Sequence, residues 1–165
     1  MPNRLFVTAL LVGISASSFA QKTYVQCGRL LDVRAGKLLK EQTVVVENGR
    51  ISAVQAGYQA GGATDKVVDL KTRTVLPGLI DCHVHLEFQS SKTAFYEGFI
   101  LNPADVAFQS LAYARTTLLA GFTTVRDMGG SGVNVALRDA ISRGQVVGPR
   151  VFTAGRAISA TGGHM

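Results

Sequence analysis

The order of strand-like and helix-like stretches after Pro77 is the strongest constraint on the fold. The segments GLIDCHVHL, FTTVRD and PRVFTAG are short, rich in aliphatic or β-branched residues and typical of strands, and two helix-like segments separate them. Strands that alternate with helices in this way predict a parallel sheet or barrel, which places this part of the chain in the α/β class.

Capping residues mark the boundaries of the two helices. Asn102 followed by Pro103 is a typical helix start, because Asn accepts hydrogen bonds from free backbone N–H groups and Pro has no N–H to satisfy. Gly121 is expected to end that helix, and a second helix over about residues 134–143 ends at Gly144.

The segment before Pro77 has a different rhythm, with short β-rich runs and tight turns. The pair Asn48-Gly49 between two such runs predicts a hairpin. A few short strands do not readily bury two faces, so we expect residues 21–76 to form the N-terminal strands of a small β-sandwich completed by strands from elsewhere. Residues 77–165 then form the part in which strands and helices alternate.

Composition narrows the class of protein. The chain has 165 residues and 47% hydrophobic content, which suits a globular domain with a sizeable core. Its formal charge of +6 is scattered, with no run of Lys or Arg and no interleaved aromatic residues, so no nucleic-acid partner is expected.

Residues 1–20 are typical of a secretory signal peptide. Arg4 precedes an apolar run, and Ser18 and Ala20 supply small residues where a signal peptidase needs them. The apolar run is about half of the roughly 20 residues that a membrane span requires, so no stable membrane anchor is expected. We expect an exported protein, periplasmic or secreted, with cleavage after Ala20 and Gln21 as the mature N-terminus.

The chain has two cysteines, Cys27 and Cys82. An exported protein lies where disulfides persist, so a bridge is one alternative. Cys82 lies on the apolar side of its strand and is expected to be a small buried residue, which favours two free thiols over a bridge.

The strand GLIDCHVHL alternates apolar and polar side chains. The apolar face carries Ile80, Cys82, Val84 and Leu86, and the opposite face carries Asp81, His83, His85 and Glu87. The Cα atoms of the two histidines are about 6.6 Å apart at a rise of roughly 3.3 Å per residue, so both imidazoles can reach one ion. Taken alone, such a pair also fits a solvated strand face. The apolar opposite face, the preceding Pro-Gly turn and the βα units that follow favour a metal site.

Three separated motifs resemble one family. LPGLIDCHVHLE closely resembles the first barrel strand of the metal-dependent amidohydrolase superfamily, in which a Pro-Gly-aliphatic pair precedes Asp-x-His-x-His. LLAGFTTVRDMGG and GPRVFTAGRAISATGGH resemble the second and third strand regions of its imidazolonepropionase-like and Xaa-Pro dipeptidase-like subgroup. The resemblance implies the N-terminal part of a (β/α)₈ TIM barrel beside a small β-sandwich, and one or two divalent ions, usually zinc, held in part by His83 and His85.

The resemblance also implies ligands that this chain does not contain. The family's further ligands, typically a carboxylated Lys, two histidines and an Asp, lie on the fourth to eighth strands, and the proton-shuttling carboxylate is the eighth-strand Asp. The catalytic general base is therefore expected beyond Met165, and the chain is expected to be inactive as it stands.

Other residues near the strand ends are further candidates. Asp81 either orients a ligand histidine or makes a structural hydrogen bond. Asp127 and Arg126 end the second strand, and His164 follows the third, so all three are candidates for substrate binding, with an ordinary loop residue as the alternative for His164.

For the complete protein the resemblance implies hydrolysis of an amide C–N bond in a small molecule. The subgroup resemblance and export together favour a dipeptide such as Xaa-Pro or an N-acyl amino acid over the cyclic amide of the imidazolonepropionase type. A non-catalytic binding or structural module is the competing class, and a homo-oligomer is among the assemblies expected of the complete protein.

Overall fold

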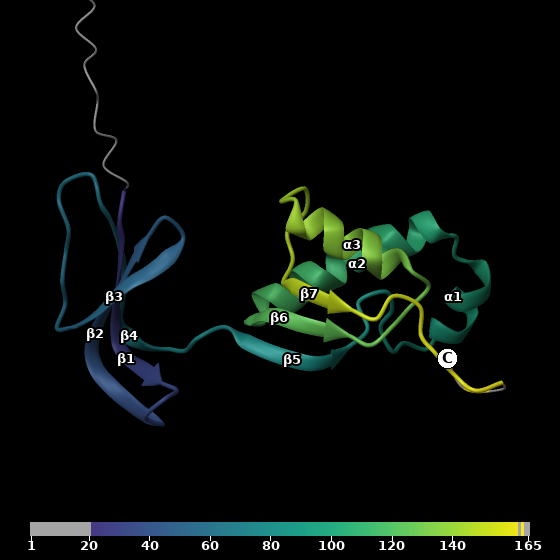
Figure 1. The fold of residues 1–165 in the computed structure, drawn as a ribbon, viewed down its shortest axis with the longest axis horizontal. Helices are drawn as coiled ribbons and strands as arrows, with labels where there is room; N and C mark the ends of the chain where they lie inside the picture. The colour runs from purple at the N-terminus through teal and green to yellow at the C-terminus, as the bar shows by residue number, and fades with distance from the viewer. Residues whose placement is uncertain (1–20, 162, 164–165) are drawn as a thin grey trace, which may run out of the picture. The chain divides into compact units, whose positions relative to one another are not determined.

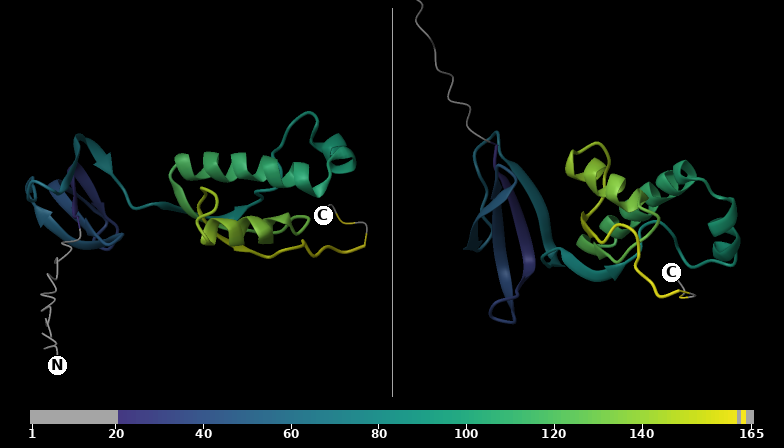
Figure 2. Two further views of the ribbon diagram at one scale, coloured as in Figure 1. Left: turned by 90° about the horizontal axis from the view of Figure 1, so that it is seen from above. Right: turned by 45° about the vertical axis from the view of Figure 1, so that its right-hand side comes forward.

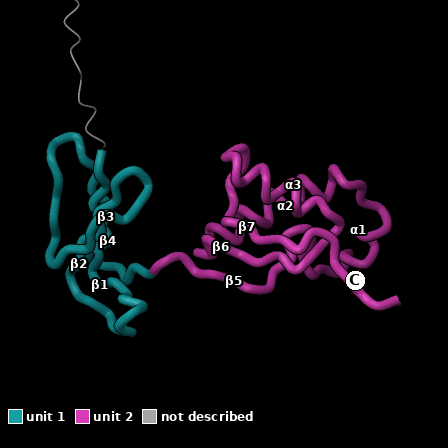
Figure 3. Tube along the Cα trace, in the orientation of Figure 1, with its two compact units in different colours: residues 1–76 teal, residues 77–165 magenta. Residues whose placement is uncertain are grey.

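The computed structural model describes residues 21–161 and 163. The signal peptide expected at residues 1–20 and the candidate His164 lie outside these described residues. The chain divides into two compact units, unit 1 (Met1–Leu76) and unit 2 (Pro77–Met165), which Figure 3 shows in different colours.

The elements of both units follow one another as the sequence patterns predict, with one addition. In chain order they are β1 (Thr23–Asp32), β2 (Lys37–Glu47), β3 (Arg50–Ala56), β4 (Lys66–Val75), β5 (Leu79–Val84), α1 (Ala94–Ile100), α2 (Pro103–Leu119), β6 (Phe122–Asp127), α3 (Val133–Ser142) and β7 (Arg150–Thr153). The addition is α1, a helix of seven residues without any buried residue, which the sequence patterns do not predict. Within the described residues, no helix is both long enough and apolar enough to span a bilayer.

Unit 1 is a four-stranded sheet with the strand order β3-β2-β1-β4. Strand β1 pairs antiparallel with β2 and parallel with β4, and β2 pairs antiparallel with β3. The hairpin predicted at Asn48-Gly49 is confirmed, because it joins β2 to β3 with positive φ angles of 52° and 71°. Two positive φ angles are what a two-residue hairpin turn needs to match the twist of its strands.

Buried residues of unit 1 gather on β1 and β2. They are Gln26, Cys27, Thr43, Val44 and Val45. The buried hydroxyl of Thr43 donates to the carbonyl of Gly57 at 2.7 Å and accepts from the amide of Gln59 at 2.9 Å. The buried hydroxyl of Thr43 therefore has a hydrogen-bond partner both as donor and as acceptor, as a buried polar group needs.

Unit 2 contains a three-stranded sheet with the order β5-β6-β7, in which both pairings are parallel. Figures 1 and 2 show α2 and α3 side by side over one face of this sheet. The predicted alternation of strands and helices, and the parallel sheet that follows from it, are confirmed. The core lies between this face and the two helices and contains Leu86, Ala114, Val125, Leu137 and Val151.

The predicted start of α2 is confirmed in atomic detail. The Asn102 side chain accepts from the amides of Ala104 at 2.8 Å and Asp105 at 3.2 Å, and Asp105 accepts from the Asn102 amide at 3.0 Å. This reciprocal arrangement is a capping box. In contrast, the N-cap residue of α3 is Gly132, which has no side chain to cap the helix.

The apolar face predicted for β5 is wrong in part. Leu86 is buried and Val84 packs against the core, but Ile80 is 67% exposed and Cys82 is exposed as well. The reason is that the register of β5 against β6 shifts between Asp81 and Val84, so Ile80 pairs with Thr124 whereas Val84 pairs with Asp127 on the other face of β6. The strict alternation that would place Ile80 and Val84 on one face is therefore interrupted. Both cysteines are free, as predicted.

Candidate functional site

The two histidines lie where β5 ends. His83 is the second-last residue of the strand, and His85 follows it directly. Because Val84 packs against the core and neighbouring side chains alternate, His83 lies on the face of the sheet opposite α2 and α3. The two imidazole rings come together, with centroids 5.5 Å apart and planes at 68°. Parallel strands end at one edge of their sheet, so the pair lies at the edge where barrel enzymes place their active sites.

The ring of His85 is held in one orientation. Its Nδ1 lies 2.8 Å from the carbonyl oxygen of Gly129, and its ring stacks on Phe88 with centroids 5.0 Å apart. A carbonyl oxygen only accepts hydrogen bonds, so Nδ1 must carry the proton in this contact. The other nitrogen, Nε2, then keeps its lone pair, which is the form of imidazole that coordinates a metal.

These donors fit part of a zinc site. Neutral imidazole is a good zinc ligand, and His83 is exposed while His85 presents a free Nε2. Zinc takes three or four protein ligands, and within residues 21–161 and 163 no three His, Cys, Asp or Glu side chains lie close enough together to hold an ion. The described residues thus offer two imidazole donors, fewer than a zinc site needs.

Asp81 makes a local contact. Its Oδ1 accepts from the backbone amide of His83 at 2.9 Å. Of the two roles considered for Asp81, the structure shows the structural hydrogen bond, which shapes the backbone that carries His83.

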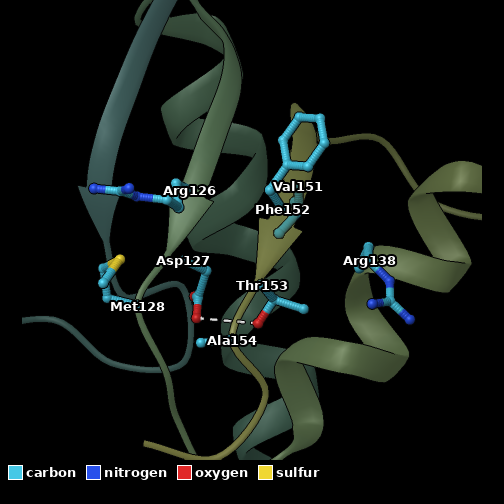
Figure 4. Close-up of a pocket in the computed structure, with 8 residues that line it drawn as sticks. All are labelled: Arg126, Asp127, Met128, Arg138, Val151, Phe152, Thr153 and Ala154. Carbon is cyan, nitrogen blue, oxygen red and sulfur yellow. Dashed lines mark hydrogen bonds between the residues drawn. The ribbon is translucent and has the colours of Figure 1, made fainter.

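Arg126 and Asp127 are neighbours in sequence but point to different sides of β6 (Figure 4). Arg126 is exposed on the face that carries His83, and its Nε donates to the carbonyl of Cys82 at 2.7 Å. Asp127 lies on the helix side and is 0% exposed. The structure therefore brings Arg126 to the accessible face of the strand ends and removes the Asp127 carboxylate from it.

Glu87 is a residue whose surroundings the strand pattern misplaces. The alternation predicts it beside the histidines, yet it is only 6% exposed and accepts from the amides of Ser131 at 2.6 Å and Asn134 at 2.7 Å. The prediction fails because β5 ends at Val84, and the alternation of faces ends with it. A glycine-rich segment leading into a helix, which leaves free N–H groups, is the signal that points to such a remote acceptor.

Two hollows adjoin these strand ends. One has a volume of about 500 Å³ and is lined by Arg126, Thr153 and Arg138, among others (Figure 4). The other, of about 590 Å³, lies between α1 and the strand ends and includes Phe88, the stacking partner of His85, in its wall.

Comparison with known proteins decides the family. The Amidohydrolase family matches residues 74–163, which is more than half of the chain. The chain belongs to the amidohydrolase family. The predicted resemblance is thereby confirmed, and the match spans the histidine pair, the second strand and the third strand.

Solved structures agree with this assignment of the amidohydrolase chain. A Xaa-Pro dipeptidase with methionine bound in its active site has a TM-score of 0.78 and 37% identity over 87% of this chain and 36% of its own. A prolidase in complex with N-methylphosphonate-L-proline has a TM-score of 0.74 and 35% identity over 87% of this chain and 34% of its own. The predicted fold class is confirmed: the strands and helices of unit 2 are the N-terminal part of an amidohydrolase barrel.

Curated relatives point to several members of the amidohydrolase family. Ochratoxinase from Aspergillus niger is 36% identical over 91 residues, which cover 54% of this chain and 18% of the relative. Imidazolonepropionase from Klebsiella pneumoniae (strain 342) is 45% identical over 60 residues, covering 36% of this chain and 14% of the relative. The chain thus spans less than a fifth of the length of these relatives and about a third of the solved chains.

Proposed function

We propose that the complete protein is a metal-dependent hydrolase that cleaves an amide C–N bond in a small molecule. The observation that carries this proposal is the state of His85, whose Nδ1 is tied to the Gly129 carbonyl while Nε2 is free beside the imidazole of His83. Membership of the amidohydrolase family supports it, because that family is generally metal-dependent.

Zinc is the ion we propose first, as one or two ions. His83 and His85 would hold it with imidazole nitrogens, and ligands outside this chain would complete the set. When bound, the ion supplies a water that is nucleophilic near neutral pH and polarises the scissile carbonyl. The chain's own part in the reaction is to hold and orient the two imidazoles, and we assign the proton-carrying carboxylate to no residue of this chain.

A dipeptide such as Xaa-Pro or an N-acyl amino acid is the substrate class that we propose. The prolidase in complex with a proline phosphonate and the Xaa-Pro dipeptidase support it, since both match 87% of this chain. Substrates of this class carry a carboxylate. Arg126 is exposed at the strand ends, and its Nε alone is used by Cys82, so its terminal nitrogens can receive that carboxylate in a bidentate pair. His164 is a second candidate for contact with substrate.

A cyclic amide of the imidazolonepropionase type is the second candidate substrate. The observation that favours it is the 45% identity to imidazolonepropionase over 60 residues. Because that match covers only 36% of the chain, we rank it below the dipeptide class.

The test uses the full-length protein stripped of metal with a chelator and then reloaded with zinc. We expect hydrolysis of Xaa-Pro dipeptides or N-acyl amino acids to depend on zinc, and a variant with both His83→Ala and His85→Ala to bind less zinc and to lose activity. Arg115→Ala, at an exposed position of α2, is the control and should keep both properties. Unchanged zinc content in the double variant would overturn the assignment of the metal site.

We also propose that the protein is exported after cleavage following Ala20, on the basis of the apolar run and the small residues before Gln21. Mass spectrometry of the periplasmic or secreted product should find Gln21 at its N-terminus. A product that retains the apolar run would contradict export by this route.

A further inference from the structure

The carboxylate of Asp127 is a buried hub of hydrogen bonds. Its Oδ2 accepts from the amide of Leu86 at 2.8 Å, and its Oδ1 accepts from the amide of Gly129 at 3.0 Å and from Nδ2 of Asn134 at 2.8 Å. The hydroxyl of Thr153 lies at 3.4 Å from Oδ1, the contact drawn in Figure 4. One side chain on β6 thus joins the segment after β5, the turn after β6, helix α3 and strand β7.

Two of these hydrogen bonds fix the backbone around the His85 imidazole. Leu86 is the next residue in the chain, so the bond to its amide fixes the backbone that carries the imidazole. Gly129 provides the carbonyl oxygen that accepts from Nδ1 of His85, and its own amide is held by the same carboxylate. The position of the imidazole and the position of its acceptor therefore both depend on Asp127.

The turn itself leaves little freedom for a different arrangement. Gly129 has φ of 130°, and a Cβ atom there would lie 2.8 Å from the Cα of Ala157. A charged acceptor buried among N–H groups makes stronger hydrogen bonds than a neutral one. The carbonyl of Gly129 is consequently held in one direction by packing on one side and by the carboxylate on the other.

We propose that Asp127 is a positioning residue for His85, which acts through the Leu86 amide and the Gly129 peptide to keep Nδ1 protonated and Nε2 directed to the metal. This inference rests on the proposed function, because it assigns His85 to the metal. It replaces substrate contact as the role of Asp127, since the carboxylate is buried and already bonded on both oxygens.

The first experiment measures zinc affinity of the full-length protein by competition with a chromophoric chelator, for the wild type, Asp127→Asn and Thr153→Val. An Asn side chain has one acceptor oxygen. Whichever way its amide lies, an NH₂ group faces either the Leu86 amide or the Gly129 amide, and one bond beside His85 is lost. We expect Asp127→Asn to weaken zinc binding by about 10- to 100-fold, as loss of an outer hydrogen-bond partner of a ligand histidine typically does.

Thr153→Val is the matched control. It removes the longest contact to the same carboxylate, together with the acceptor of the Gly155 amide, and touches neither Leu86 nor Gly129. Its zinc affinity should stay within about threefold of the wild type, below the 10-fold loss expected for Asp127→Asn. Equal zinc affinity of folded Asp127→Asn and wild type would overturn the inference.

The second experiment uses the metal-free wild type and therefore does not depend on whether an Asp127 variant folds. Nitrogen NMR of the metal-free wild type labelled at histidine, with His85→Ala to assign the signal, reports which ring nitrogen carries the proton. We expect the Nδ1-protonated form for His85, and the Nε2-protonated form would overturn the inference. If His85→Ala itself leaves zinc affinity unchanged, the proposed metal site fails instead, so the two failures are distinguishable.

Discussion

The histidines and the carboxylates of unit 2 lie at the same strand ends, but their surroundings differ. His83 is exposed, and His85 keeps one ring nitrogen free of any partner within the described residues. Asp127 and Glu87 are buried, and both oxygens of each accept backbone amides. A donor atom without a partner is available to a ligand, whereas a carboxylate surrounded by N–H groups holds the backbone in place.

This contrast separates two kinds of consequence for substitutions. Changes at the histidines should affect chemistry and leave the fold almost unchanged. Changes at the buried carboxylates or at helix caps should affect the free energy of unfolding first, and the size of that effect should follow how many buried partners are left without a bond.

The largest effect is expected at His83. If His83 holds zinc as proposed, its replacement by Ala in the full-length protein should lower hydrolysis by about 100-fold or more, because loss of a metal ligand impairs activation of water. The free energy of unfolding of the metal-free protein should change by no more than about 0.5 kcal/mol, since the side chain is exposed. Steady-state kinetics and urea unfolding provide the two readouts. A large loss of stability in the metal-free variant would show that His83 supports the fold rather than the chemistry.

Glu87→Gln should show the reverse pattern. Gln has one acceptor oxygen, so either the Ser131 amide or the Asn134 amide loses its partner at the buried start of α3. We expect a loss of about 1–3 kcal/mol in the free energy of unfolding, from the unpaired N–H group and from removal of negative charge at a helix N-terminus. Urea unfolding of the metal-free protein measures it. Wild-type stability in this variant would mean that α3 does not depend on Glu87.

Asn102→Ala tests a cap that is exposed rather than buried. It removes the acceptor for the first amides of α2, and a loss of about 1 kcal/mol is expected, as is typical for a capping Asn. Asn102→Asp is the matched variant, because Asp also caps helices and should restore most of the stability. A larger loss in the free energy of unfolding for Asn102→Ala than for Glu87→Gln would contradict the expectation that buried partners matter more than exposed ones.

The smallest effect concerns a buried ionisable group with few polar contacts, Cys27 of unit 1. Burial raises the pKa of its thiol above the ordinary value of 9.0. The folded state therefore holds this proton more tightly than the unfolded state, so its contribution to stability is present below about pH 9 and is lost as the pH rises through the folded pKa.

Urea unfolding at a series of pH values checks this contribution. Cys27→Ala should show a weaker loss of stability above pH 9 than the wild type. Tyr58→Phe is a necessary control, because partial desolvation, together with the nearby carboxylates of Glu41 and Asp69, also raises the pKa of Tyr58 above its ordinary value of 10.0. Identical slopes in wild type and Cys27→Ala would contradict the prediction.

Local features of the fold are predictable from the sequence because they depend on neighbours in the chain. The capping box at Asn102, the hairpin at Asn48-Gly49 and the alternation of strands and helices in unit 2 each follow from a few adjacent residues. The meeting of His83 and His85 is local too, since the two residues are separated by a single residue in the chain and their ring centroids lie 5.5 Å apart.

Features that depend on distant segments were decided by the tertiary structure. The strand pattern places Glu87 beside the histidines, but the end of β5 releases it to the start of α3, 44 to 47 residues away. The exposure of Ile80 follows from register shifts between β5 and β6, which depend on the pairing of two strands that lie about 40 residues apart in the chain.

The sequence by itself determined the pairing of His83 with His85, the helix caps and the parallel α/β pattern, because backbone geometry links residues a few positions apart. Only the tertiary structure decided that Arg126 is exposed while Asp127 is buried, and that the Gly129 carbonyl selects the ring nitrogen of His85 that stays free. The physical reason is that a polar group's role depends on which partners surround it, and these partners come from segments that only folding brings together.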